Sequence, residues 1–231
     1  MPKERLKLKV VPIFQEEKMK TLIITGGKIN KNFAKKYLKS NKYDIIIAVD
    51  KGLETIDYLK LQPQYVLGDF DSVNTKILEK YKKQNIKIIK LNPEKDLTDT
   101  HSAIDLALKL KSTEITILGA IGTRLDHTMA NIHILKQALD KNIKAKIVNE
   151  KNKIELINKE IIIKKDDNYK YVSIIPLTTN VTGITIEGMK YIINDYTLSI
   201  GDSLGVSNEQ IDKEAKISIK TGILVVIKSK D

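Results

Sequence analysis

Cysteine and tryptophan are absent from this chain of 231 residues, and only three phenylalanines occur in it. Without cysteine there is no disulfide bridge, no thiolate zinc site and no cysteine nucleophile, which fits a reducing cytoplasm. No apolar run approaches the roughly 20 residues that a transmembrane helix needs, and the N-terminus lacks the apolar segment of a signal peptide. We therefore expect a soluble, cytoplasmic protein whose core rests on isoleucine, leucine and valine, without a membrane partner.

Arginine is almost as scarce, because only Arg5 and Arg124 contribute to the 40 basic residues. The formal net charge of +11 suits a nucleic-acid-binding module, which is the non-enzymatic alternative for this chain. The lysines, however, are scattered and lack the interleaved aromatic residues that stack on bases, so we interpret them as a solvated surface and expect no nucleic-acid partner. A rare arginine in a lysine-rich chain indicates a planar, bidentate contact, which singles out Arg124.

Short apolar runs alternate with helical segments from Met19 to about residue 148. The expected strands are 21–25, 44–49, 65–67, 86–90, 115–118 and 145–148, and the expected helices are 32–39, 53–61, 75–83, 97–111 and 125–141. This alternation predicts an N-terminal α/β domain with a mostly parallel sheet flanked by helices. Ligands of such sheets bind at the carboxyl ends of the strands.

The pattern changes after about residue 149. Short runs rich in isoleucine, valine and threonine are separated by turn signals, and no helical period is present. We therefore expect a C-terminal all-β domain, a sandwich or barrel, over residues 149–231. Residues 1–18 fit neither domain, and we expect them to be a disordered or loosely packed N-terminal extension.

Two aspartates, Asp69 and Asp71, follow the third expected strand in the segment G-D-F-D-S at residues 68–72. Two carboxylates at the end of a buried strand cannot both stay charged and close together without a cation, and Mg²⁺ takes one or two carboxylates while leaving positions for phosphates. The alternative is that Asp69 caps a helix and Asp71 is a turn residue. The pair Asp96 and Asp99 poses the same choice between a helix cap and a further metal ligand.

Glycine-rich turns follow three other expected strands. These turns are Gly26-Gly27 after the first strand, Asp50-Lys51-Gly52 after the second, and Gly119-Ala120-Ile121-Gly122 after the fifth. Because the carboxyl ends of parallel strands meet at one edge of a sheet, the four turns together predict a crevice for phosphates and a metal ion.

The last turn leads into the expected helix 125–141. Arg124, His127 and Asn131 share one face at its amino end, where an arginine beside free backbone N–H groups can hold phosphate oxygens and neutralise charge during transfer. The core-facing stripe is expected to be Leu125, Met129, Ile132 and Leu139.

At these residues the chain resembles the thiamine pyrophosphokinase family. The marks of the family are an Asp-x-Gly turn, then G-D-F-D-S, then K-D-x-T-D, then G-x-x-G-x-R-x-D-H with an asparagine four residues beyond the histidine. In this sequence they stand at 50–52, 68–72, 95–99 and 119–127, with Asn131. The family's small-x-Ser-Asn segment is matched by Gly205-Val206-Ser207-Asn208, so the resemblance covers about residues 19–227.

The resemblance implies an α/β domain over residues 19–148 that binds ATP and Mg²⁺, and a β domain over residues 149–231 that helps to hold thiamine. It implies an enzyme that moves the β,γ-diphosphate of ATP onto the thiamine hydroxyl and leaves AMP, as a homodimer with active sites between subunits. The implied metal ligands are Asp69, Asp71 and one of Asp96 or Asp99, the residues expected to act in catalysis are Asp71, Asp99 and Arg124, and the thiamine side is Ser207 and Asn208. The residues expected to bind ATP are Gly26, Gly27, Asp50, Lys51, Gly52, Gly119, Gly122, Arg124, His127 and Asn131.

The sequence departs from the family pattern at some positions, and one rival enzyme class is left as an alternative. Lys51 stands where many members have glycine, which could add a phosphate contact but would strain a backbone with positive φ. There is no tryptophan to stack on thiamine. The rival is a Mg²⁺-dependent phosphatase of the haloacid-dehalogenase type, because residues 69–73 fit D-x-D-x-[TV]. Against it, this motif follows the third strand instead of the first, and residues 201–206 lack the expected second acid.

Overall fold

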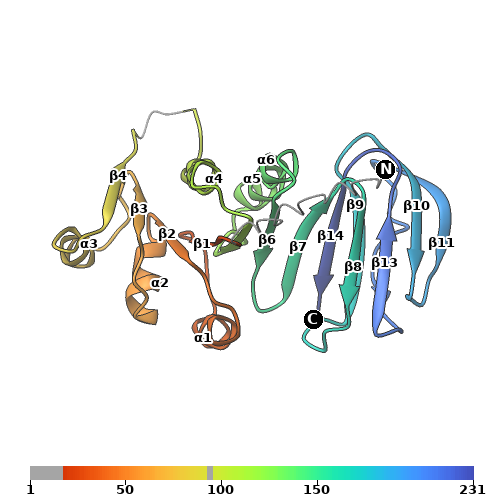
Figure 1. Ribbon diagram of the computed structural model, residues 1–231, viewed down its shortest axis with the longest axis horizontal. Helices are drawn as coiled ribbons and strands as arrows, with labels where there is room; N and C mark the ends of the chain where they lie inside the picture. The colour runs from red at the N-terminus through yellow and green to blue at the C-terminus, as the bar shows by residue number, and fades with distance from the viewer. Residues whose placement is uncertain (1–17, 93–95) are drawn as a thin grey trace, which may run out of the picture.

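The computed structural model describes residues 18–92 and 96–231, and it confirms the predicted alternation of strands and helices up to residue 148 (Figure 1). The strands are β1 (Lys20–Ile24), β2 (Ile45–Val49), β3 (Tyr65–Gly68), β4 (Lys87–Lys90), β5 (Glu114–Leu118) and β6 (Lys144–Val148). The helices are α1 (Lys31–Ser40), α2 (Gly52–Leu59), α3 (Thr75–Lys82), α4 (Asp99–Lys109), α5 (Leu125–Ile134) and α6 (Lys136–Leu139). Apart from Lys18, the extension predicted at residues 1–18 lies outside the described residues.

One predicted helix, 125–141, is divided into α5 and α6. The backbone N–H of Leu135 donates to the carbonyl oxygen of Ile132, three residues back, at 3.3 Å. This tight turn ends α5 and buries the side chain of Leu135, which is 1% exposed. The helix is therefore interrupted at Leu135, and burial of this large apolar side chain offsets the loss of regular helical hydrogen bonds.

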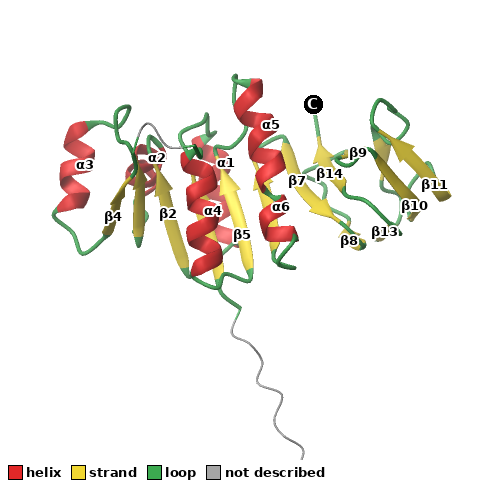
Figure 2. Cartoon of the chain, turned by 90° about the horizontal axis from the view of Figure 1, so that it is seen from above, coloured by secondary structure: helices red, strands yellow, loops and turns green. Residues whose placement is uncertain are grey.

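β1 to β6 run parallel, in the order β6-β5-β1-β2-β3-β4. Helices cover both faces of this part of the sheet, with α4, α5 and α6 against one face and α1, α2 and α3 against the other (Figures 1 and 2). Burial on two faces explains why β1 is an uninterrupted apolar run, since Leu22, Ile23 and Ile24 are all fully buried. No helix in the described ranges is long and apolar enough to cross a membrane.

The C-terminal part is all-β, as predicted, and its antiparallel strands form a two-layer sandwich. β7 (Asn152–Ile157), β14 (Leu224–Ser229), β9 (Tyr171–Pro176) and β12 (Asn208–Glu209) continue the parallel sheet beyond β6, giving ten strands in the order β12-β9-β14-β7-β6-β5-β1-β2-β3-β4. The second layer is β11 (Ile193–Ser199), β10 (Asn180–Glu187), β13 (Glu214–Ser218) and β8 (Glu160–Lys164). Buried residues such as Leu224 in the first layer and Ile217 in the second share one apolar core. One sheet thus spans the predicted boundary near residue 149, and the boundary itself stays a prediction.

Candidate active site

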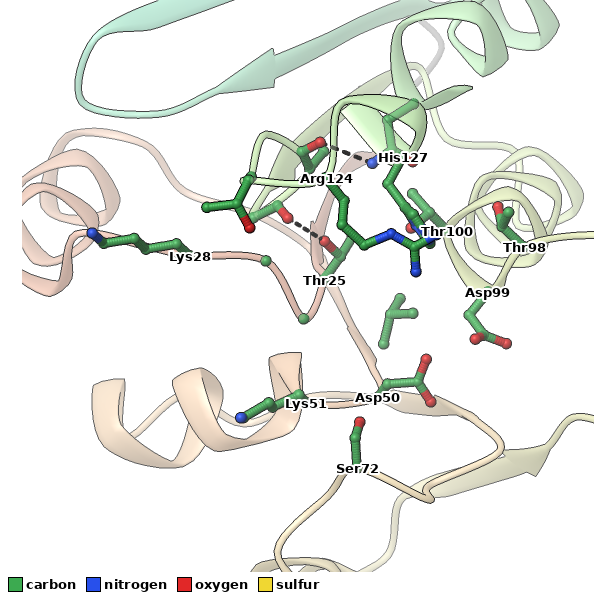
Figure 3. Close-up of a pocket in the computed structure, with 18 of the residues that line it drawn as sticks. Thr25, Lys28, Asp50, Lys51, Ser72, Thr98, Asp99, Thr100, Arg124 and His127 are labelled. Carbon is green, nitrogen blue, oxygen red and sulfur yellow. Dashed lines mark hydrogen bonds between the residues drawn. The ribbon is translucent and has the colours of Figure 1, made fainter. Parts of the chain in front are cut away.

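A cavity of about 600 Å³ opens at the carboxyl ends of β1, β2, β3 and β5 (Figure 3). The chain runs outward from β1 to β4 and then returns to place β5 on the other side of β1, so the cavity lies where the strand order reverses. Loops diverge at such a point and leave a crevice, which is where open α/β sheets bind ligands. The predicted residues that line the cavity are Gly26, Gly27, Asp50, Lys51, Asp69, Asp99, Gly119, Gly122, Arg124, His127 and Asn131.

The turns after β2 and β3 are fitted to each other. The backbone N–H of Asp50 donates to the carbonyl oxygen of Leu67 at 2.9 Å, and Asp50 has a positive φ of 45°. Gly68 has a φ of 150°, and a Cβ atom there would overlap Oδ1 of Asp50. Only glycine therefore leaves room for this carboxylate. Lys51 has a φ of −57°, so the expectation of backbone strain at Lys51 is wrong. The residue with a positive φ in this turn is Asp50.

Asp50 faces two other carboxylates. Burial is the main cause that raises the pKa of Asp50 to about 7, and the nearby carboxyl groups of Asp99 and Asp69 raise it further. Oδ1 of Asp50 is buried and accepts no hydrogen bond within the described part of the chain. A carboxylate oxygen left in this state, beside two more acids, fits a site that receives a cation.

The described residues contain no group of three or more His, Cys, Asp or Glu side chains arranged to hold a metal ion. A site with fewer than three such ligands is still compatible with Mg²⁺, because this ion takes one or two carboxylates and completes its octahedron with water and substrate phosphates. Asp50, Asp69 and Asp99 are the acids that line the cavity.

Asp71 and Asp96 are exposed and do not line the cavity. The backbone N–H of Asp71 donates to Oδ1 of Asp69 at 3.0 Å, so Asp69 closes a turn and caps no helix. Asn74 caps α3. Thr98 caps α4, with its Oγ1 accepting from the N–H of His101 at 3.2 Å, so the alternative that Asp96 or Asp99 caps this helix is wrong.

The loop between β5 and α5 is held from two sides. Oγ1 of the buried Thr25 donates to the carbonyl oxygen of Gly119 at 2.7 Å, which ties the loop to β1. Nδ2 of Asn131, a residue 7% exposed, donates to the carbonyl oxygen of Ala120 at 2.8 Å. Oγ1 of Thr128 accepts from the N–H of Gly122 at 3.3 Å. Asn131 thus lines the cavity while its amide group fixes the shape of the loop.

Arg124 precedes α5 and extends into the cavity toward the side that carries Asp99 (Figure 3). Its guanidinium donates to Asp126 at 2.6 Å, and this contact lowers the pKa of Asp126 to about 2. Both side chains are largely exposed, so the ion pair is a weak one that an incoming phosphate can replace. Leu125 and Met129 are 75% and 54% exposed, so their predicted place in the core is wrong. Ile132 and Leu139 do pack against it.

Several polar residues that the sequence reasoning missed also line the cavity. They are Thr25, Lys28, Ser72, Thr98, Thr100 and Thr123. Each lies within two residues of a predicted site residue, in a strand-end loop or the first turn of α4. Position relative to a strand end was therefore the signal that could have found them.

Gly52, Ser207 and Asn208 do not line the cavity. Asn208 is buried, and its side-chain amide accepts from the N–H of Tyr191 at 3.0 Å and donates to the carbonyl oxygen of Tyr191 at 2.7 Å. Ser207 is exposed, with a positive φ of 61°. Both lie at β12, which β9, β14, β7 and β6 separate from β5.

Comparison with known proteins gives matches along most of the chain. The family model "Thiamin pyrophosphokinase, catalytic domain" matches residues 35–147, and "Thiamin pyrophosphokinase, vitamin B1 binding domain" matches residues 159–224. The thiamine pyrophosphokinase of Bacillus subtilis is 32% identical over 214 residues, which cover 92% of this chain and 100% of that protein.

Two solved structures are similar in fold over the same length. The crystal structure of the Bacillus subtilis thiamine pyrophosphokinase has a TM-score of 0.84 and 31% identity, covering 92% of this chain and 99% of that one. The structure of the thiamin pyrophosphokinase of Geobacillus thermodenitrificans has a TM-score of 0.81 and 29% identity, covering 92% of this chain and 98% of that one.

Proposed function

The chain belongs to the thiamin pyrophosphokinase family, and we propose that it transfers the β,γ-diphosphate of ATP to the hydroxyl group of thiamine, which releases AMP. The observation that carries this proposal is the cavity at the strand-order reversal, where Asp50, Asp69 and Asp99 face Arg124 across a space of about 600 Å³. Such a volume suits a small organic ligand. Acids on one side and a guanidinium on the other suit a polyphosphate that arrives with a cation.

Mg²⁺ is the cation that this donor set fits. Asp69 and Asp99 would hold it, with Asp50 beside them, because these carboxylates line the cavity and no described residue donates a hydrogen bond to Oδ1 of Asp50. Asp71 and Asp96 are adjacent in sequence to lining residues, and they stay proposed ligands from the motif alone. When bound, the ion would offset the negative charge of the phosphates and orient them.

The residues of the chain would act mainly by position and charge. The hydroxyl oxygen of thiamine attacks the β-phosphorus of ATP, the bond from that phosphorus to the oxygen of the α-phosphate breaks, and AMP leaves with the bond's electrons. Arg124 would exchange Asp126 for oxygens of the transferred diphosphate and offset the charge that develops there. The proton of the hydroxyl passes to a carboxylate, and Asp99 and Asp71 are both candidates. The loop at Gly119 to Gly122 would offer backbone N–H groups to phosphate oxygens.

Thiamine would be held by a second copy of the chain. β12 lies five strand spacings from β5, which at about 4.8 Å each places Ser207 roughly 24 Å from the cavity of its own chain. Register nevertheless puts it at the same edge of the sheet, because the pairs Val148–Lys153, Lys153–Lys228 and Ser229–Tyr171 lead from the end of β6 to the start of β9 beside Asn208. A homodimer can therefore bring β12 of one copy to the cavity of the other.

Exposed apolar side chains at both places support this arrangement. Leu125 and Met129 lie on α5 beside the cavity, and Tyr191, Ile192 and Val206, which lie near β12, are 60%, 72% and 51% exposed. Contact between the two groups would remove apolar surface from water. Tyr191, whose backbone Asn208 holds, is an aromatic candidate for stacking on thiamine.

The test is to mix the protein with ATP, Mg²⁺ and thiamine and to follow AMP and thiamine diphosphate. We expect both products in equal amounts and neither one without thiamine or Mg²⁺. Release of inorganic phosphate without AMP would support the phosphatase alternative instead. Cytoplasmic location stays a prediction from the sequence.

A further inference from the structure

A second cavity, of about 860 Å³, lies on another part of the molecule, where β8 turns away from β7. β6, β7 and β8 form most of its walls, together with the end of α6 and with Lys228 of β14. None of its lining residues lines the cavity at the strand-order reversal. We call this second cavity the β8 groove, and the proposal made for it is independent of the proposed function.

A buried lysine forms part of the groove wall. Lys228 is 7% exposed, and burial lowers the pKa of its ammonium group. The polar contacts of Nζ are long, at 3.4 Å to the carbonyl oxygen of Lys164 and 3.8 Å to a carboxylate oxygen of Asp166, and the ammonium group also lies over the ring of Tyr169, 5.3 Å from its centroid. An ammonium group has three donors and usually makes charge-assisted hydrogen bonds of about 2.7–2.9 Å. Among the residues that the structure describes, Lys228 is therefore a buried cation that makes one long hydrogen bond through Nζ.

A second lysine stands directly beside it. Lys153 on β7 is the register partner of Lys228 on β14, and both side chains belong to the groove. Like charges in this cross-strand position repel each other and destabilise the sheet. Lys153 is paired with Glu155 at 2.8 Å, so the carboxylates that act on Lys228 are Asp166, at 3.8 Å, and Glu155, which Lys153 already engages.

The rest of the groove also carries an excess of positive charge. Its lining includes seven lysines, which are Lys144, Lys146, Lys153, Lys159, Lys164, Lys165 and Lys228, against the four acids Glu114, Glu155, Glu160 and Asp166. Of the acids, Glu160 is paired with Lys216, which lies outside the lining, at 2.9 Å. Lys164 and Lys165 are exposed beside Asp166. An anion entering the groove would thus meet a buried ammonium group and further lysines along the wall.

The groove is also partly apolar. Leu139 and Ile143, which pack against the main core, line it together with Ile161 of β8. Its volume lies within the range of about 300–1,000 Å³ that is typical of sites for small organic ligands. One small ligand could therefore contact both the lysine-rich part and the apolar part of the groove.

We propose that the β8 groove is a second binding site, for a small organic phosphate whose phosphate group contacts Lys228 and Lys153 and whose less polar part lies against Leu139, Ile143 and Ile161. The phosphate oxygens would accept hydrogen bonds that Nζ of Lys228 does not make with the described residues. They would also relieve the repulsion between Lys228 and Lys153.

Inorganic pyrophosphate, without Mg²⁺, is the probe for the anion-binding end. We would titrate it into ¹⁵N-labelled protein and follow the backbone amides of residues 153, 164–166 and 228 by NMR. We expect saturable shifts of these amides in the wild type and in Arg124→Ala, which weakens the other cavity. Lys228→Met should lower the affinity for pyrophosphate, measured at these amides, by about tenfold or more, because one charged hydrogen-bond donor is lost.

Two further variants keep the test decisive. Lys164→Ala combined with Lys165→Ala changes only exposed side chains, so it should fold and still weaken binding by a few-fold. Lys82→Ala, an exposed lysine of α3, is the matched control and should bind as the wild type does. The proposal is overturned if the groove amides do not shift at high pyrophosphate, or if Lys228→Met and the double variant both bind with wild-type affinity.

Discussion

The side-chain amide of Asn131 donates a hydrogen bond of 2.8 Å to the carbonyl oxygen of Ala120. Asn131 belongs to α5, whereas Ala120 belongs to the loop that follows β5, so this bond fixes a loop of the proposed phosphate site against a helix. Its burial, at 7% exposure, shields the bond from water. Asn131 is therefore a positioning residue for the loop at Gly119 to Gly122.

Replacing Asn131 with leucine keeps a similar volume but removes the donor. The loop should lose its fixed shape, so we expect kcat/KM for ATP to fall by about 10- to 100-fold, mainly through KM. Stability should drop by about 1–3 kcal/mol, because the carbonyl oxygen of Ala120 stays buried without a partner. The control is His133→Ala, an exposed residue of the same helix. An unchanged KM for ATP in a folded Asn131→Leu protein would contradict the role.

The acids of the cavity should differ in their effect on activity. Asp99 lines the cavity, whereas Asp71 is exposed and does not. We expect Asp99→Asn to lower kcat by at least about 100-fold. Asp71→Asn should also lower it, through the metal or the base, and the structure predicts the smaller loss of the two. Asp140→Asn, which removes an exposed acid paired with Lys136, is the control.

Titration of the Mg²⁺ dependence separates the two roles of these acids. A metal ligand should shift the Mg²⁺ concentration at half-maximal rate, whereas a base should lower kcat at every Mg²⁺ concentration. Wild-type kinetics for Asp99→Asn would exclude Asp99 from both roles.

Asp50 should make the folded state less stable as the pH rises. Its pKa is raised to about 7 from 3.8, so between these values the folded chain holds a proton that the unfolded chain has lost. Stability due to this group therefore falls with rising pH through that window. Asp50→Asn removes the effect and tolerates a positive φ, so it should raise Tm at pH 7.5 by about 2–4 °C.

The difference in Tm between the wild type and Asp50→Asn reports on Asp50, because the two proteins share all other titrating groups. Thermal unfolding of both at pH 4.5, 6 and 7.5 measures it, and the gap in Tm should widen as the pH rises. Adding Mg²⁺ should narrow the gap by stabilising the charged carboxylate. A gap that stays constant with pH would contradict the raised pKa.

The strand ends were predictable from the sequence, and this is why most of the cavity was. In a parallel sheet the carboxyl ends share one edge, so finding Asp50 and Asp69 at two such ends is enough to bring them together. The pairing of Asn131 with Ala120 was not predictable, because the same asparagine could equally have faced a ligand. The three-dimensional structure is needed to distinguish a residue that shapes a loop from one that contacts substrate.

Local pattern also failed where neighbours decide burial. Leu125 and Met129 have core-like spacing but are exposed in the single chain, because the packing of α5 uses Ile132 instead. β11 carries little hydrophobic signal, because most of its residues are exposed and polar. β7 extends the N-terminal sheet by pairing antiparallel with β6. The spacing of apolar residues within one strand does not indicate which other strand it pairs with.

The proposal that two copies of the chain share each site predicts complementation between two inactive variants. Asp99→Asn damages the cavity, whereas Ser207→Arg places a large cation at Ser207, which we propose to lie on the thiamine side of the site. Each variant alone should be nearly inactive. In a mixed population half of the dimers pair one variant with the other, and each of these holds one intact site, so roughly a quarter of wild-type activity should return.

The matched control combines Asp99→Asn with Asp50→Asn. These two residues line the same cavity of one chain, so no pairing of the variants creates an intact site and no activity should return. The variants are mixed by co-expression with different tags, and the heterodimer is purified before its thiamine diphosphate formation is measured. Because one of its two sites would be intact, the purified Asp99→Asn and Ser207→Arg heterodimer should show about half of wild-type activity. If the Asp99→Asn and Ser207→Arg heterodimer were as inactive as the control, the site would have to be built within a single chain. The separation of β12 from β5 by four strands argues against that.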